Sequence, residues 1–199
     1  MEKLDWLSSE KLLKNYGVPV VKTIKINLKD DLKKINKFPV VMKVDSENIV
    51  HKTEQHAVIL DIDSKEELEY AYEKLAKFEA PLVVQEQIKG AEILLGIKED
   101  ATFGKVIVAG IGGIYAEALK KISMRVVPLS VKDAKEIVME SELKNILTSR
   151  GADYDFDFVE TLILKISKMA QKENIKEMDI NPFILTKKKG YAVDVRIFV

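Results

Sequence analysis

The chain has 199 residues, enough for one substantial domain or two small lobes with a hydrophobic core. Lys plus Arg and Asp plus Glu are both 32, so no overall charge favours nucleic acid or an anionic membrane, and any bound anion must be held by local geometry. Cysteine is absent, which excludes disulfides, thiol catalysis and thiolate metal sites. The N-terminal segment lacks a signal-like apolar core and no apolar run approaches about 18 residues, so we expect a cytoplasmic protein with no membrane partner. The Lys-rich and Glu-rich composition favours a thermophilic source.

The first half of the chain alternates between strand and helix patterns. Short β-branched or continuously apolar runs indicate strands, and apolar residues at helical spacing behind a serine indicate capped helices. We expect, in order, a helix over 8–16 that ends at Gly17, a strand over 20–26, a helix over 29–37, strands over 38–44 and 57–62, a helix over 64–78 and a strand over 81–88. Together these predict an N-terminal α/β lobe over about residues 18–87.

The second half opens with two strands at hairpin spacing. We expect strands over 91–97 and 105–111, a glycine-rich segment over 110–117, a strand over 124–129, helices over 131–147 and 156–173, and a final strand that turns at Asn181-Pro182 before a hairpin across Lys188, Lys189 and Gly190. These elements predict a C-terminal lobe over about 88–199, with helix 8–16 packed on it. Gly90 would permit a hinge between the lobes.

Polar residues near the C-terminus form a candidate metal site. Strand alternation places Asp179 and Asn181 on one face, and the hairpin back through residues 191–196 can bring Asp194 beside them. Carboxylate and amide oxygens suit a hard cation that keeps several waters, and Mg²⁺ bridging nucleotide phosphates is the usual instance. A surface turn built on Asn-Pro chemistry is the alternative interpretation.

Two cations lie in or at the end of predicted strands. Lys43 closes an apolar strand and Arg125 lies inside another, so each is either a phosphate ligand or a side chain that keeps its charged end in water. The glycines at 110, 112 and 113 either let backbone amides approach an anion or only shape a loop, since their spacing matches neither a Walker loop nor a dinucleotide fingerprint.

Six segments, taken in order, resemble the ATP-grasp subunit of the ADP-forming acyl-CoA (acetyl-CoA) synthetases, a relative of the succinyl-CoA synthetase β chain. The segments are LLKNYGVPV, FPVVMKVDSENIVHKTEQHAV, VVQEQIKGAEILLGIKEDATFG, GIGGIYAEALKKISMRVVPLS, RGADYD and EMDINPFILTKKKGYAVDVRI. The resemblance covers nearly the whole chain. It implies a two-lobed ATP-grasp fold of the α/β (α+β) class with nucleotide between the lobes. It also implies an acid-thiol ligase that transfers a phosphoryl group between phosphohistidine and ADP or ATP with Mg²⁺, and that needs a CoA-binding α subunit in a heterotetramer.

The resemblance also implies roles for single residues. Asn181 and Asp194 match the family's magnesium ligands, and Asp179 matches a carboxylate facing the transferred phosphate. Lys43 matches a lysine that contacts nucleotide phosphates. Further matches are Glu86, Gln87 and Ile88 in the hinge that holds adenine largely through its backbone, Glu92 nearby, and Glu117 and Arg125 at polar positions that approach the phosphate site.

Both histidines lie in the segment KVDSENIVHKTEQHAVIL. His51, followed by Lys52, resembles the histidine of the family's HKSD-type motif, which implies a second phosphate carrier between the partner's histidine and ADP. The alternative is that His51 only hydrogen-bonds within its loop and transfer runs directly to ADP. The family usually has glycines just after this motif, where this chain has Gln55, His56 and Ala57, which puts tight closure over the nucleotide in doubt.

Three functions therefore compete. The leading hypothesis is the nucleotide-binding subunit of an ADP-forming acyl-CoA synthetase. The second is a nucleotide-binding regulatory module with reduced or lost turnover, motivated by the missing loop glycines. The third is an ATP-grasp ligase that joins a carboxylate to an amine. The first needs an α partner and His51, the second binds nucleotide without exchange, and the third needs neither a histidine nor CoA.

Overall fold

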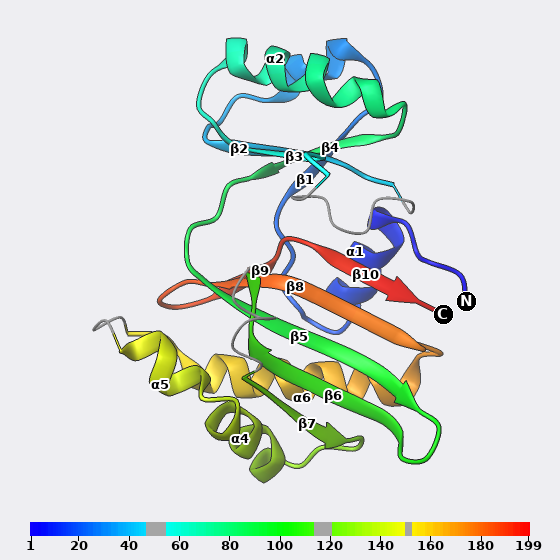
Figure 1. Ribbon diagram of the computed structural model, residues 1–199, viewed down its shortest axis with the longest axis vertical. Coiled ribbons are helices and arrows are strands. Elements are labelled where there is room, and N and C mark those ends of the chain that lie inside the picture. The colour runs from blue at the N-terminus through cyan, green and yellow to red at the C-terminus, as the bar shows by residue number, and fades with distance from the viewer. Residues whose placement is uncertain (47–54, 114–120, 150–152) are drawn as a thin grey trace. The chain divides into compact units, whose positions relative to one another are not determined.

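The computed structural model describes residues 1–46, 55–113, 121–149 and 153–199. The chain divides into two units (Figure 1): a larger unit formed by Met1–Val20 and Lys89–Val199, and a smaller unit formed by Val21–Ile88. Across the described ranges, no helix combines the length and the apolar character needed to cross a membrane.

The smaller unit is a four-stranded antiparallel sheet with the strand order β1-β4-β2-β3. Its elements are β1 (Thr23–Ile26), η1 (Lys29–Lys34), β2 (Val40–Val44), β3 (Val58–Ile62), α2 (Lys65–Leu75), η2 (Ala76–Phe78) and β4 (Leu82–Glu86). The Ser64 hydroxyl accepts the Glu67 N–H at 3.1 Å and caps α2 as its sequence predicts. A helix was expected over residues 29–37, and only Lys29–Lys34 are helical, as a short 3₁₀ segment.

The larger unit is built on a six-stranded antiparallel sheet with the strand order β10-β8-β5-β6-β7 and with β9 paired to β8. The strands are β5 (Ala91–Asp100), β6 (Gly104–Ile111), β7 (Ile122–Val126), β8 (Glu177–Leu185), β9 (Gly190–Ala192) and β10 (Val195–Phe198). The helices are α1 (Trp6–Asn15), α4 (Val131–Glu140), α5 (Leu143–Thr148) and α6 (Phe156–Lys172).

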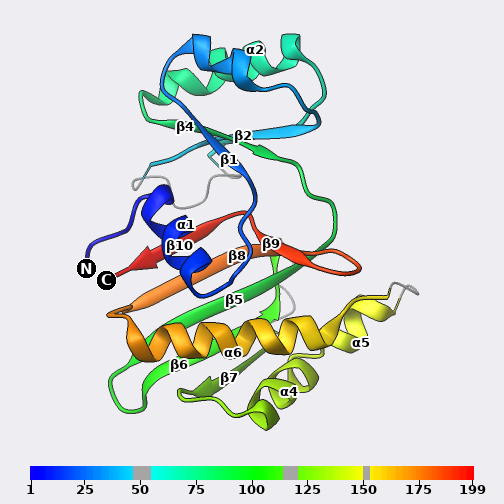
Figure 2. The same ribbon diagram turned by 180° about the vertical axis from the view of Figure 1, so that it is seen from behind.

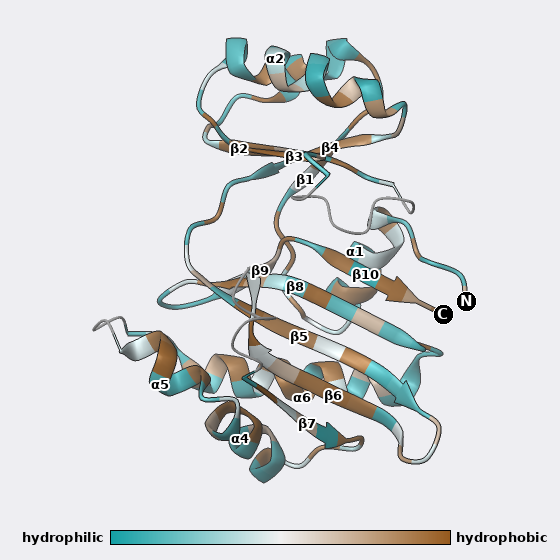
Figure 3. Ribbon diagram, in the orientation of Figure 1, coloured by the Kyte–Doolittle hydropathy of each residue, from teal (hydrophilic) through white to brown (hydrophobic). Residues whose placement is uncertain are grey.

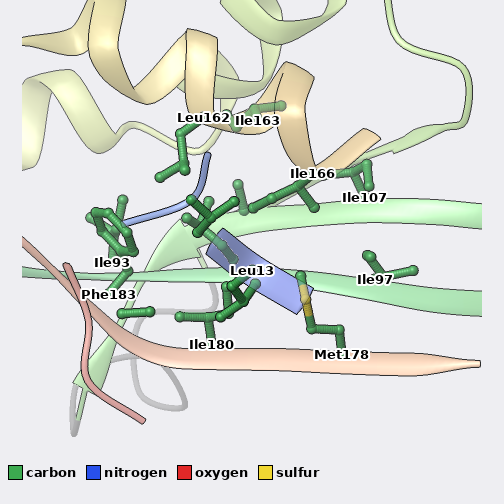
Figure 4. Packing of buried hydrophobic residues seen from close by; sticks show 14 of the residues in the cluster. Leu13, Ile93, Ile97, Ile107, Leu162, Ile163, Ile166, Met178, Ile180 and Phe183 are labelled. Carbon is green, nitrogen blue, oxygen red and sulfur yellow. The ribbon is translucent and has the colours of Figure 1, made fainter. Parts of the chain in front are cut away.

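The helices of the larger unit lie on one face of this sheet, as the views from front and back show for α1 and α6 (Figures 1 and 2). Apolar residues recur along β5, β6 and β8 and at helical spacing in α6, and these ribbons carry brown segments along their length (Figure 3). Figure 4 shows this core, to which α6 contributes Leu162, Ile163 and Ile166, the strands contribute Ile93, Ile97, Ile107, Met178, Ile180 and Phe183, and α1 contributes Leu13.

Three local predictions need correction. Helix α1 begins at Trp6, because Asp5 rather than a serine accepts the N–H of Ser8 at 2.8 Å. The helix expected over 131–147 is two helices, interrupted by Glu142 in the left-handed region at φ 56. The Asn181-Pro182 pair is not a turn, because β8 continues through it.

Asn181 and Pro182 instead form a bulge in β8. Ile93 pairs with Phe183 and Leu95 with Ile180, so Leu94 of β5 faces two residues of β8. The extra residue keeps Met178, Ile180, Phe183 and Leu185 all in the core although their spacing breaks the period of two. The residues between them point to the opposite face of the sheet, here called the open face because α1 and α6 lie on the other side (Figure 2).

Candidate functional site

The open face of β8 carries Asp179 and, at the bulge, Asn181. Both neighbours of Asp179 along the strand, Met178 and Ile180, are core residues, so Asp179 points away from the core. Its cross-strand partners are Gly96 on β5 and Arg196 on β10. Gly96 places no side chain beside Asp179, and the Val108 Cβ lies 3.7 Å from where a Cβ on Gly96 would be.

Asp194 lies just before β10 and close to Asp179. The backbone N–H of Asn181 donates to the Asp194 carbonyl oxygen at 3.2 Å, which ties this segment to the bulge. Burial raises the pKa of the Asp179 carboxyl, the Arg196 guanidinium lowers it, and the charges of Asp194 and Glu177 raise it further. The two carboxylates therefore interact electrostatically, and the hairpin expected from sequence does bring Asp194 to this corner.

The amide oxygen of Asn181 is held by the glycine-rich segment. The Gly113 N–H donates to Asn181 Oδ1 at 2.9 Å, and the Gly112 N–H donates to the Glu92 carbonyl oxygen at 2.9 Å. Gly113 has φ +65, and a Cβ built there would lie 1.6 Å from Glu92 Oε2. The structure thus brings Glu92, Gly113 and Asn181 together, and these glycines approach polar side chains of β5 and β8.

Asp179, Asn181 and Asp194 fit a hard cation that is also bound by waters or phosphate oxygens. Two carboxylates and one amide oxygen lie at the corner, and in the part of the chain that the structure describes no three His, Cys, Asp or Glu residues gather to hold a metal. The described residues of this corner therefore do not form an all-protein cage. Mg²⁺ is commonly held by one or two carboxylates together with phosphate oxygens and waters, which matches this donor set.

Arg125 does not join these residues. It pairs with Ile107 across β6 and β7, and Ile107 is a core residue, so Arg125 points to the helix side of the sheet. There its guanidinium forms ion pairs with Glu136 and Glu140 of α4, the first at 3.4 Å. The expectation that Arg125 approaches the phosphate site came from its motif, and the register of β7 places it on the opposite face from Asp179.

Lys43 lies in the smaller unit at the centre of a sheet. It is 8% exposed and pairs with Val58 of β3 and Val83 of β4. Its strand neighbours Met42 and Val44 belong to the hydrophobic core, so Lys43 points to the other face of its sheet. The position on β2 matches the sequence analysis.

The segment expected to hold adenine begins in β4. Glu86 is the last residue of the strand and is exposed, while Gln87 and Ile88 follow it. The Gln87 side chain exchanges two hydrogen bonds with Asp61, each of 2.8 Å. Gly90, expected to permit a hinge, is packed closely instead, since a Cβ there would lie 2.3 Å from the Leu185 carbonyl oxygen.

Three predicted residues lie outside the described residues: His51, its neighbour Lys52, and Glu117. Their assignments rest on the sequence. His56 is described, and it is an exposed residue with φ 53 in the turn before β3. Its backbone thus has the left-handed conformation that favours glycine, at the position where the resembled family usually has one.

Arg196 is the charged residue of this corner that the sequence analysis missed. A signal for it was present, because Asp194 and Arg196 are two residues apart in a predicted strand and share a face. The family resemblance assigns a role to Asp194 but none to Arg196.

The comparisons with known proteins agree with this architecture. A family model described as an ATP-grasp domain matches residues 1–199. The chain is 34% identical over 210 residues to the β subunit of acetate–CoA ligase [ADP-forming] II from Pyrococcus furiosus, covering 96% of this chain and 89% of that subunit. It is 35% identical over 198 residues to acetate–CoA ligase [ADP-forming] II from Archaeoglobus fulgidus, but spans only 29% of that longer protein.

Solved structures of acetyl-coenzyme A synthetase 1 from Ca. Korarchaeum cryptofilum superpose on the chain. One, in complex with coenzyme A and Ca-AMPCP, has a TM-score of 0.91 and 29% identity and covers 100% of this chain and 93% of its own. Another, with coenzyme A and Mg-AMPPCP, has its phosphohistidine segment pointing towards the nucleotide-binding site, with a TM-score of 0.83, 29% identity and coverage of 98% and 92%. The predicted fold class is confirmed, and the chain belongs to the ATP-grasp family, in the branch represented by the β subunits of ADP-forming acetate–CoA ligases.

Proposed function

We propose that the chain is the nucleotide-binding subunit of an ADP-forming acyl-CoA synthetase and transfers a phosphoryl group between a phosphohistidine and ADP. The observation that carries the proposal is the group of Asp179, Asn181 and Asp194 on the open face of the six-stranded sheet, in a chain of this family. The P. furiosus relative is named as the β subunit of an ADP-forming acetate–CoA ligase, and the Korarchaeum structures contain metal nucleotides, one of them with its phosphohistidine segment pointing towards the nucleotide-binding site.

The corner of the larger unit would hold Mg²⁺ through the Asn181 amide oxygen and the Asp194 carboxylate. The Gly113 N–H fixes the orientation of the Asn181 amide, and the oxygen keeps a second lone pair for a cation. When bound, the metal supplies positive charge that neutralises phosphate oxygens. Asp179, on the same face, would lie against the transferred phosphate. Catalysis of this kind depends on positioning and on charge neutralisation.

The remaining assignments are part of the same proposal. Lys43 would contact the nucleotide phosphates, Glu86, Gln87 and Ile88 would hold the adenine, and Glu92 and Glu117 would lie near the phosphates. His51 would carry the phosphoryl group between the partner's histidine and ADP. We leave Arg125 out of the site, because two carboxylates of α4 bind it on the other side of the sheet.

A CoA-binding α subunit completes the proposed enzyme. The chain covers nearly all of a relative named as a β subunit but under a third of a longer relative with the same activity, which supports a division of that activity between two chains. A heterotetramer, a cytoplasmic location and a thermophilic source remain predictions from the sequence.

A calorimetric titration with ADP in the presence of Mg²⁺ tests the nucleotide site. Asp194→Asn removes a charged metal ligand and should weaken binding of the metal nucleotide by at least several-fold, roughly tenfold if the family role holds. Asp100→Asn is the matched control, because Asp100 lies at the β5–β6 hairpin, where it accepts the N–H of Thr102 at 2.8 Å. Equal affinity of wild type and Asp194→Asn would remove the metal assignment.

The second candidate, a regulatory module without turnover, rests on the residues that replace the family's loop glycines. His56 nevertheless keeps a glycine-like backbone conformation, which favours retention of the active loop shape. An exchange assay decides between the two functions. A chain that binds Mg-ADP but exchanges no phosphate with a phosphorylated partner is a module, and one that exchanges it is an enzyme subunit.

A further inference from the structure

A row of open-face residues crosses three strands at the proposed metal site. Gly96 of β5, Asp179 of β8 and Arg196 of β10 are direct cross-strand partners, in that order. Asp194 lies two residues before Arg196, and Asn181 two residues after Asp179. Arg196 is therefore a cation directly across from Asp179 and two residues along the chain from Asp194.

The charge balance of the corner depends on that cation. Asp179 is half-buried, and Arg196 lies directly across from it on the neighbouring strand. A bare divalent cation is attracted by the two carboxylates and repelled by Arg196. A cation that is bound to a phosphate group is attracted to this corner by both kinds of charge. The carboxylates attract the metal, and the Arg196 guanidinium attracts the phosphate oxygens.

We propose that Arg196 is a positioning residue that makes this corner select a divalent metal already bound to a phosphate group over the free metal ion. The inference rests on the proposed nucleotide site and adds a residue that would discriminate between the metal–phosphate complex and the free metal ion. Gly96 contributes by leaving the surface next to Asp179 free of a side chain, on the side away from Arg196.

The test compares two ligands on the full chain, with Mn²⁺ alone as the first probe and Mg-ADP as the second. In Arg196→Gln, the loss of a nearby positive charge should tighten Mn²⁺ binding by about threefold to tenfold and weaken Mg-ADP binding by about tenfold. A purely structural role for Arg196 would weaken both, so the opposite signs identify the electrostatic role. Arg196→Lys, which keeps the charge, should restore the wild-type order of affinities at least in part.

Arg125→Gln is the matched control, since it makes the same chemical change on the other face of the same sheet. We expect both affinities to stay within about twofold of wild type there, as for a distant screened charge. Circular dichroism and thermal unfolding show whether each variant is folded. If Arg196→Gln weakens the binding of both ligands, or of neither, the inference is wrong, whereas the proposed nucleotide site still stands. A wild-type chain that binds neither Mn²⁺ nor Mg-ADP overturns the proposed function and this inference with it.

Discussion

Gly113 shows how one residue can support a site without carrying any chemistry. Its N–H donates to Asn181 Oδ1, and its missing side chain leaves room for the Glu92 carboxylate. Its φ of +65 also lies in the region where a side chain meets the following carbonyl oxygen. The position therefore combines a backbone requirement with a contact to the proposed metal ligand.

Gly113→Ala and Gly104→Ala separate these two requirements. Gly104 has φ +75 with nothing within 4 Å of an added Cβ, so each substitution should lower the free energy of unfolding by roughly 1–2 kcal/mol through backbone strain. Only Gly113→Ala displaces Glu92 and Asn181, so it alone should weaken Mg-ADP binding, by roughly tenfold. Urea unfolding and calorimetry measure the two effects, and equal nucleotide affinity in both variants would contradict the role given to Gly113.

His51 is predicted to be phosphorylated during transfer to ADP. If it carries phosphate, incubation with labelled ATP and Mg²⁺, or with a phosphorylated partner, should give an acid-labile, base-stable label. His51→Asn should abolish the label. His56→Asn is the control and should leave most of it, because His56 is an exposed residue of the turn before β3. Wild-type turnover of His51→Asn in the reconstituted complex would end the carrier role and favour direct transfer to ADP.

The sequence predicts correctly which residues of one strand and of its returning hairpin lie together. It does not predict which residues lie together only because of how two strands pair. Asp179, Asn181 and Asp194 come together through one strand and its return, which alternation and a hairpin signal indicate. The face to which Arg125 points depends on how β7 pairs with β6, which no local pattern reports. That register separates Arg125 from Asp179.

The bulge in strand β8 determines which side chains of the strand face the core and which face the candidate site. A sequence containing Asn-Pro suggests a turn, because proline cannot donate a ladder hydrogen bond. Here the strand continues and the bulge accommodates the proline, since Leu94 faces both residues of the pair. The apolar spacing 178, 180, 183, 185 is the sequence signal of that bulge, and it becomes recognisable once the four side chains are known to share one core.

The short segment η1 carries an ionisable group whose pKa sets a pH dependence. The Asp31 carboxylate pairs with Lys34 at 2.7 Å and accepts the N–H groups of Leu28 and Asn27 at 3.0 and 2.9 Å, which lowers its pKa to about 2. A carboxyl with a lowered folded-state pKa contributes stability above its unfolded pKa. That contribution is lost as the pH falls from about 4 towards 2.

Asp31→Asn should therefore destabilise the protein at pH 6 and change its stability little at pH 2.5. Thermal unfolding of wild type and variant at the two pH values measures the difference. Asp30→Asn is the neighbouring control, since it removes an exposed ion pair with Lys33 that contributes little. A difference between wild type and Asp31→Asn that is the same at both pH values would exclude the linkage.

The chain contains only part of what the synthesis of an acyl-CoA requires. The chain spans 89% of the P. furiosus β subunit and 29% of the A. fulgidus ligase. The described structure supplies the proposed metal and phosphate corner on one sheet and a buried lysine on the other. The motifs found in the sequence all belong to the nucleotide half of the resembled enzymes, and none resembles a site for CoA.

The chain incubated alone with acetate, CoA, ATP and Mg²⁺ should therefore form no acetyl-CoA, although it binds Mg-ADP. Synthesis requires the acyl group, CoA and a phosphohistidine to meet, and an imidazole phosphate must come within about 3–3.5 Å of ADP for in-line transfer. A CoA-binding partner chain should restore synthesis, measured as acetyl-CoA by chromatography. The Asp194→Asn chain with the same partner is the control, because it should lose rate through weaker nucleotide binding. Acetyl-CoA formed by the chain alone would overturn the two-part enzyme.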